Sequence, residues 1–182
     1  MSLSTSVLLR GQPLAFVAGL TSLGYELDGV STTGVGHRFV RGVVKIDVLL
    51  PDGIGSRAPR EVKPGVRSVE VPGGTQALSR SVPIEVRTTS TSGTIHRPSL
   101  LGAILVKARA VEVDDLPDAQ GEDLAFLLSL VPDPFDSSKG LSKKERTWLR
   151  RRAKLFEPGA RAWLAIDNAE DGRLALGILA GS

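Results

Sequence analysis

The first hundred residues alternate short apolar runs with clusters of Gly, Pro, Ser and Thr, a pattern typical of strands joined by turns. One stretch differs. In "PLAFVAGLTSLGYEL" the apolar residues recur at helical spacing, Pro13 suits a first helical turn and Gly24 a stop, so we expect a helix. The strands that we expect are residues 7–9, "HRFV" paired as a hairpin with residues 43–50, and then "RSVEV", "VPIEVRT" and "GTIHR", with a loop over residues 51–66.

Beyond residue 97 the apolar segments become longer and take helical spacing. Ser99 can cap one helix, and Ser142 stands three residues before Glu145, which is the capping-box pattern. We expect helices in "PSLLGAILVKARAVEV", "GEDLAFLLSLV" and "LSKKERTWLRRRAKLF", short closing helices in "ARAWLAI" and "EDGRLALGILA", and a connector at "PDPFDSSKG". The pattern therefore predicts an α+β protein, with an α/β region over residues 1–97 and a helical region over residues 98–182.

The composition of the chain excludes several kinds of site and indicates where the protein is located. The 182-residue chain has no cysteine, which excludes disulfides, thiolate zinc sites and cysteine nucleophiles. No apolar run approaches the roughly 20 residues of a membrane span, and the first residues lack the pattern of a signal peptide. We expect a cytoplasmic protein that does not contact a membrane.

Positive charge is concentrated in one predicted helix. The net charge is +3, and "KKERTWLRRRAK" holds seven Lys or Arg residues against one acid. Such clusters can bind nucleic acid, and the candidate RNA-binding residues are Arg146, Arg150, Arg151 and Lys154. The alternative is a solvated helix face, since arginine clusters also keep proteins soluble.

Two charged residues fall within apolar faces of predicted helices. On a helical wheel Lys107 lies among Leu100, Ala103 and Ile104, and in the next helix Asp123 lies near Phe126, Leu127 and Leu130. A short acidic side chain in such a place needs a cation or hydrogen-bond donors. We expect a buried Lys107–Asp123 ion pair, which would serve equally as a structural link and as part of an active site.

Asp47 is a third charged residue in an apolar run, "VVKIDVLLPDG". On an alternating strand it shares a face with Lys45, while Val44, Ile46 and Val48 share the other. The sheet can therefore present a solvated Lys–Asp face, or Asp47 can line a cleft that binds phosphate.

Weaker signals are discounted. His37 and His96 are too few and too isolated for a metal cluster or a hydrolase triad. "PGGTQALSR" has glycines like a phosphate-binding loop but lacks the lysine that follows them in a Walker motif, so a β-turn is favoured.

Taken in order, three segments resemble the nucleotidyltransferase-like toxins of bacterial toxin–antitoxin pairs, the AbiEii/MenT group. They are "KIDVLLPDG", then "PSLLGAILVKARA" with its embedded lysine, then "GEDLAFLL" with an acid near its start, and the similarity in arrangement runs from about residue 14 to 156. The resemblance implies a nucleotidyltransferase-like mixed β-sheet in the amino-terminal half.

The same resemblance implies a function. It suggests transfer of a nucleotidyl group from an NTP, held with Mg²⁺, to RNA, with the 3′ end of tRNA as acceptor, and neutralisation by a cognate antitoxin. Lys107 would contact the NTP phosphates, Asp123 would fix Lys107 or act near the acceptor hydroxyl, and Asp47 would be a catalytic carboxylate and metal ligand.

One defining element of that family differs here. The family has a glycine-serine turn followed by Asp-x-Asp on a strand, whereas this chain reads "LSTSVLLR", with Ser4 and Ser6 where aspartates are expected. Serine hydroxyls do not neutralise Mg²⁺. Either the chain begins downstream of the true start or the metal site is altered. Two alternatives follow: a catalytically silent nucleotidyltransferase-fold module that binds a nucleotide or a protein, and a small basic RNA-binding protein in which Lys107 and Asp123 are only a core pair.

Overall fold

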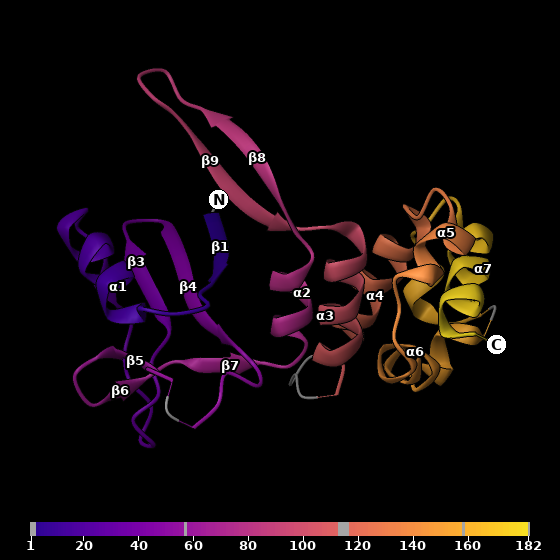
Figure 1. Ribbon diagram of the computed structural model, residues 1–182, viewed down its shortest axis with the longest axis horizontal. Coiled ribbons are helices and arrows are strands. Elements are labelled where there is room, and N and C mark those ends of the chain that lie inside the picture. The colour runs from indigo at the N-terminus through magenta and orange to yellow at the C-terminus, as the bar shows by residue number, and fades with distance from the viewer. Residues whose placement is uncertain (1–2, 57, 113–116, 158, 182) are drawn as a thin grey trace. The chain divides into compact units, whose positions relative to one another are not determined.

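The computed structural model describes residues 3–56, 58–112, 117–157 and 159–181 (Figure 1). It divides into two compact units, unit 1 (Met1–Thr75) and unit 2 (Gln76–Ser182). Strands dominate unit 1 and helices dominate unit 2, so the α+β class expected from the sequence is confirmed. The units divide after residue 75, ahead of a long hairpin, whereas the boundary expected from the sequence follows that hairpin.

A five-stranded mixed sheet forms the centre of unit 1. Its order is β1-β4-β3-β2, in which β1 runs parallel to β4 and the hairpin β3–β4 is antiparallel, as expected; β7 also pairs with β4 in parallel. The strands are β1 (Leu3–Leu8), β2 (Glu26–Leu27), β3 (Arg38–Arg41), β4 (Val44–Pro51) and β7 (Val69–Val71), and a separate pair is formed by β5 (Glu61–Lys63) and β6 (Val66–Arg67).

One face of this sheet packs on α1 (Pro13–Ser22), the predicted helix that begins at a proline. Val17 and Leu20 of α1 join Phe39 and Val48 of the sheet in one buried cluster. Because side chains alternate along β4, residue 47 points away from this cluster. The sheet is therefore apolar on the face toward α1 and polar on the other.

The strands of unit 2 form a hairpin of β8 (Ser81–Arg87) and β9 (Ser92–Pro98), both predicted from the sequence. All seven residues of β9 and five of the seven in β8 are exposed. Figure 1 shows the hairpin as a two-stranded ribbon extending from the start of α3 (Leu100–Ala110).

The helices of unit 2 enclose its core. Ile104, Leu105, Leu124, Leu149 and Leu176 are fully buried there, together with the indoles of Trp148 and Trp163. The helices are α3, α4 (Pro117–Ser129), α5 (Pro134–Lys139), α6 (Lys143–Arg150) and α7 (Ala169–Ala180), with 3-10 turns at Ala153–Phe156 and Arg161–Trp163. None of the helices within the described ranges is long and apolar enough to cross a membrane.

Local capping signals account for two helix starts. The Ser99 hydroxyl accepts a hydrogen bond from the Gly102 N–H at the start of α3, and Ser142 and Glu145 form the predicted capping box of α6. Two short helices were not expected. "PDPFDSSKG" is not a plain connector, because the Asp133 carboxylate caps α5 and Pro134 opens it. "PGGTQALSR" turns at residues 72–73 and then forms α2 (Gly74–Ser79).

Candidate functional site

The face of the unit 1 sheet opposite α1 carries a set of polar side chains on three neighbouring strands. In the β1–β4 register Ser6 pairs with Asp47 and Ser4 with Lys45, and in the β3–β4 register Arg38 pairs with Asp47. Residues paired in register point to the same side of a sheet. We call this set, Ser4, Ser6, Arg38, Lys45 and Asp47, the polar face.

Asp47 is held in a two-point ion pair on this face. Arg38 Nε donates to Asp47 Oδ1 at 2.8 Å and Arg38 Nη2 donates to Oδ2 at 2.9 Å. The Asp47 side chain is 13% exposed. The hydrogen bonds and charge of Asp47 raise the pKa of the Arg38 guanidinium above its usual value, which favours the charged form of Arg38.

The polar face does not fit the magnesium site that the resemblance implies. Mg²⁺ requires several oxygen ligands in an octahedral arrangement, with carboxylates to neutralise its charge. Asp47 accepts from Arg38 through both of its oxygens, and its neighbour on β1 is the neutral Ser6. The register puts one more carboxylate on this face, Glu26, but on β2, two strands away from β4. Within the described residues no three His, Cys, Asp or Glu side chains are grouped as metal ligands. A metal at Asp47 would compete with the Arg38 guanidinium for the carboxylate.

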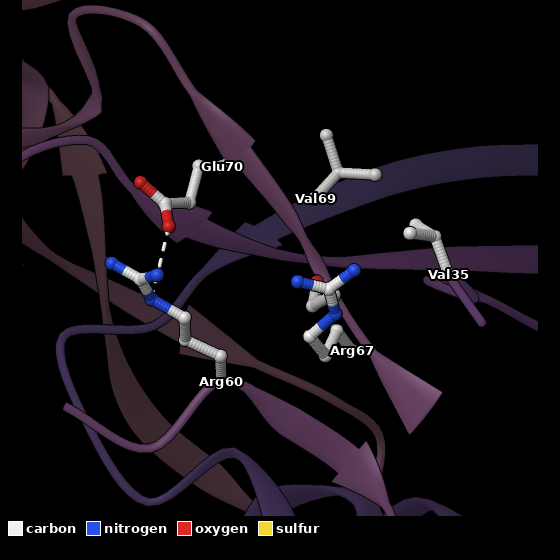
Figure 2. A pocket seen from close by; sticks show the side chains of 6 residues that line it. Val35, Arg60, Arg67, Val69 and Glu70 are labelled. Atoms are coloured by element: carbon white, nitrogen blue, oxygen red, sulfur yellow. Dashed lines mark ion pairs between the residues drawn. The ribbon is translucent and has the colours of Figure 1, made fainter. Parts of the chain in front are cut away.

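A shallow hollow of about 310 Å³ lies elsewhere in unit 1 (Figure 2). Arg60 and Glu70 form an ion pair there, with 3.0 Å between Arg60 Nε and Glu70 Oε1. Arg67 also lines the hollow, and its guanidinium has no hydrogen bond or ion pair with a described residue. The remaining lining residues are Val35, Ser68 and Val69. None of the residues singled out in the sequence lies in this hollow.

Lys107 and Asp123 meet in unit 2, which confirms their predicted pairing. Lys107 Nζ donates to Asp123 Oδ2 at 2.7 Å and to Gln120 Oε1 at 2.8 Å, so α3 and α4 are linked. Their expected burial is wrong: Asp123 is 59% exposed, because α4 buries Leu124 and Leu128 instead. An ammonium has three N–H donors. Two are held by Asp123 and Gln120, which leaves one that can contact a phosphate oxygen.

Two residues of the basic helix turn out to hold the end of α7. Arg146 donates from Nη1 to the Leu179 carbonyl and from Nη2 to the Ser138 carbonyl, while Arg150 Nε donates to the Ala180 carbonyl at 2.8 Å. The Leu179 and Ala180 carbonyls belong to the last turn of α7, where helical partners are lacking, and the Ser138 carbonyl belongs to the last turn of α5. Arg151 and Lys154 are exposed.

Sequence reasoning missed three arginines that matter most in the structure. Arg38 faces Asp47, and Arg109 and Arg152 both contact Glu112. The Arg38 pairing had a usable signal, because a tight turn at Gly42 in the expected hairpin places residue 38 opposite residue 47. Two backbone N–H groups of "PGGT", those of Gly73 and Thr75, are not free for phosphate, since the Asp52 carboxylate accepts both.

Comparison with known proteins gives no relative. No family model matches the chain, and neither a curated protein nor a solved structure matches it.

Proposed function

We propose that this protein is a nucleotidyltransferase-like protein of the toxin type, which binds an NTP and RNA, with the 3′ end of tRNA first among candidates, and is neutralised by a cognate antitoxin. One observation carries the proposal. The parallel β1–β4 register aligns Ser6 with Asp47 and Ser4 with Lys45 on the sheet face opposite α1. This is the arrangement of two adjacent strands that the resemblance calls for, with serines in place of two aspartates.

Lys107 and Asp123 supply further support. Lys107 follows Asp47 in the order that the resemblance requires, and Asp123 and Gln120 hold its ammonium in one orientation. A fixed ammonium with one remaining N–H suits a phosphate oxygen. Asp123 thereby acts as a positioning residue for Lys107.

The geometry favours a version in which the chain binds nucleotide and RNA without transferring a nucleotidyl group. Arg38 occupies both oxygens of Asp47, and Ser4 and Ser6 bring no charge to the face. A transferring enzyme is the second candidate. It is favoured by the Lys107–Asp123 pair, whose place in the chain matches the phosphate-binding lysine of the transferring family members.

Restoring the missing carboxylates tests both candidates. The chain, the double variant S4D/S6D and the triple variant S4D/S6D/D47N are incubated with labelled NTPs, Mg²⁺ and total tRNA. We expect the unmodified chain to bind NTP or tRNA without labelling the tRNA. S4D/S6D should transfer label to tRNA, because three aligned carboxylates then lie on one face. Adding D47N should abolish this gained transfer.

The controls separate the outcomes. K107A should weaken NTP binding in each background, with circular dichroism showing that the fold is kept. Label transfer by the unmodified chain that K107A abolishes would select the transferring candidate. Absence of NTP and tRNA binding together with no gain in S4D/S6D would overturn the proposal.

A further inference from the structure

Three arginines of unit 2 converge on one carboxylate. Arg109 Nη1 donates to Glu112 Oε2, Arg152 Nη2 donates to Glu112 Oε1 at 2.7 Å, and Arg151 Nη1 lies 3.8 Å from Oε1. Arg109 belongs to α3, whereas Arg151 and Arg152 follow α6. We call Arg109, Arg151 and Arg152 the arginine cluster.

The arginine cluster has more positive charge than its acid can neutralise. Three guanidinium groups share the single Glu112 carboxylate, and among the described residues no other acid forms an ion pair with them. The Arg109 guanidinium and Lys144 Nζ also lie 5.0 Å and 5.6 Å from the Trp148 ring centroid. Three guanidinium groups around one carboxylate repel each other unless a further anion lies between them.

Two N–H groups of the cluster are buried and have no hydrogen-bond partner among the residues that the structure describes. Arg152 is 8% exposed in its side chain, and its Nε–H has no hydrogen-bond acceptor among the described atoms; the Nε–H of Arg109 is in the same state. Unsatisfied buried donors are costly and uncommon in folded proteins. Burial, followed by repulsion from Arg109 and Arg151, lowers the pKa of Arg152, against the opposing effect of Glu112.

The cluster is open to solvent on one side. Arg151 is 62% exposed and its contact with Glu112 is the longest of the three, so its guanidinium can turn toward a second anion without breaking a close ion pair. Arg146 and Arg150 differ in this respect, because carbonyl groups already hold their N–H donors.

We propose that the arginine cluster is a phosphate-binding site, with Arg151 and Arg109 as the contacting residues, Arg152 as a buried positive charge beside them, and Glu112 as the resident carboxylate with which a phosphate competes for their N–H groups. Guanidinium groups bind phosphate oxygens through paired, charge-assisted hydrogen bonds. The phosphate comes from an RNA backbone or from a free nucleotide; the link to RNA rests on the proposed function, whereas the phosphate site itself does not.

Titration of the full chain with two probes tests the site and shows whether its phosphate belongs to an RNA or to a free nucleotide. Total tRNA and ATP without Mg²⁺ are titrated separately into the chain and into R151Q, R109Q and E112Q. The matched control is R161Q, which removes the same charge from an exposed ion pair with Glu122 in the same unit. Inorganic phosphate is added as a competitor.

We expect R151Q and R109Q each to weaken the true ligand about tenfold, the effect of losing one charge-assisted hydrogen bond. For tRNA the slope of log K against log salt should fall by about one in R151Q. E112Q should bind a few-fold more tightly because it removes the competing carboxylate. R161Q should bind as the unmodified chain does, and phosphate should compete.

If R151Q and R161Q bind both probes with equal affinity, the arginine cluster is not a phosphate site. Weaker binding by E112Q at an unchanged melting temperature would also overturn the proposal. An acidic protein as the real occupant would appear as absence of binding to both probes, which also overturns it. The proposed function fails separately, through the S4D/S6D and D47N variants in unit 1, which leave the arginine cluster intact.

Discussion

Asp47 and Asp123 give the same signal in the sequence, an acid within an apolar segment, yet they lie in different surroundings. Asp47 is 13% exposed and receives two hydrogen bonds from Arg38, while Asp123 is 59% exposed and receives one from Lys107. An ion pair gains strength with burial and with two-point geometry, and loses it in solvent. An acidic residue within an apolar segment therefore predicts that the acid has a partner, but it does not predict how strong their ion pair is.

Glu145 is a third acid with a charge partner, and it is almost completely buried. Of the changes considered, removal of Glu145 should lower the stability most. Its side chain is 6% exposed, pairs with Arg80 at 3.0 Å and accepts from the Ser142 N–H. E145A should destabilise unit 2 by about 3–5 kcal/mol, because it leaves Arg80 without its charge partner.

Urea unfolding followed by tryptophan fluorescence measures this, since both tryptophans, Trp148 and Trp163, lie in unit 2. E122A, which removes an exposed partner of Arg161, is the control and should cost less than about 1 kcal/mol. Equal losses in E145A and E122A would show that burial does not set the strength of these pairs.

The Arg38–Asp47 pair should show the next largest effect. A double-mutant cycle of R38Q and D47N should give a coupling energy of about 1.5–3 kcal/mol, the range for a hydrogen-bonded charge shielded from water. Hydrogen exchange of the β4 amides reports on unit 1, which contains no tryptophan. A coupling energy near zero would mean that Arg38 does not hold Asp47, so that the Asp47 carboxylate is available to a ligand.

The Lys107–Asp123 pair should couple more weakly. The cycle of K107Q and D123N, followed by tryptophan fluorescence, should give about 0.2–1 kcal/mol because Asp123 is largely solvated. A coupling energy as large as that of Arg38 and Asp47 would contradict the comparison, and would indicate that Gln120 and its surroundings shield the pair.

High salt should change the two coupling energies least of all, and it should lower that of Lys107–Asp123 more than that of Arg38–Asp47. At 1 M NaCl the screening length is about 3 Å, so the Lys107–Asp123 coupling should fall to near zero. The Arg38–Asp47 coupling should keep more than half its value, since Asp47 is mostly shielded. Both cycles repeated at low and high salt provide the measurement, and parallel losses would be the contrary result.

Local signals in the sequence predicted much of the fold. Pro13, Ser99 and the Ser142–Glu145 box mark helix starts, and the structure has a helix at each. The start of α5 had equally local signals, Asp133 and Pro134, but proline-rich segments also form loops, so the pattern favoured a connector.

The candidate site was less predictable because its contacts are distant in the chain. Lys107 and Asp123 are 16 residues apart on consecutive helices, and their pairing could be inferred. Arg146 lies 33 residues from the Leu179 carbonyl that it binds, and no periodicity in the sequence marks that contact. A helical wheel shows which residues share a face, whereas the packing of α6 and α7 decides which of them remain available to a ligand.

The exposed hairpin β8–β9 also has a practical use. Its turn is closed by local hydrogen bonds between Thr88 and Thr91, so Ser90 at the tip takes no part in either core. Exposed tips of this kind accept insertions and chemical labels. Because the chain contains no native cysteine, a single cysteine at position 90 would be the sole attachment point for a fluorophore that reports ligand binding.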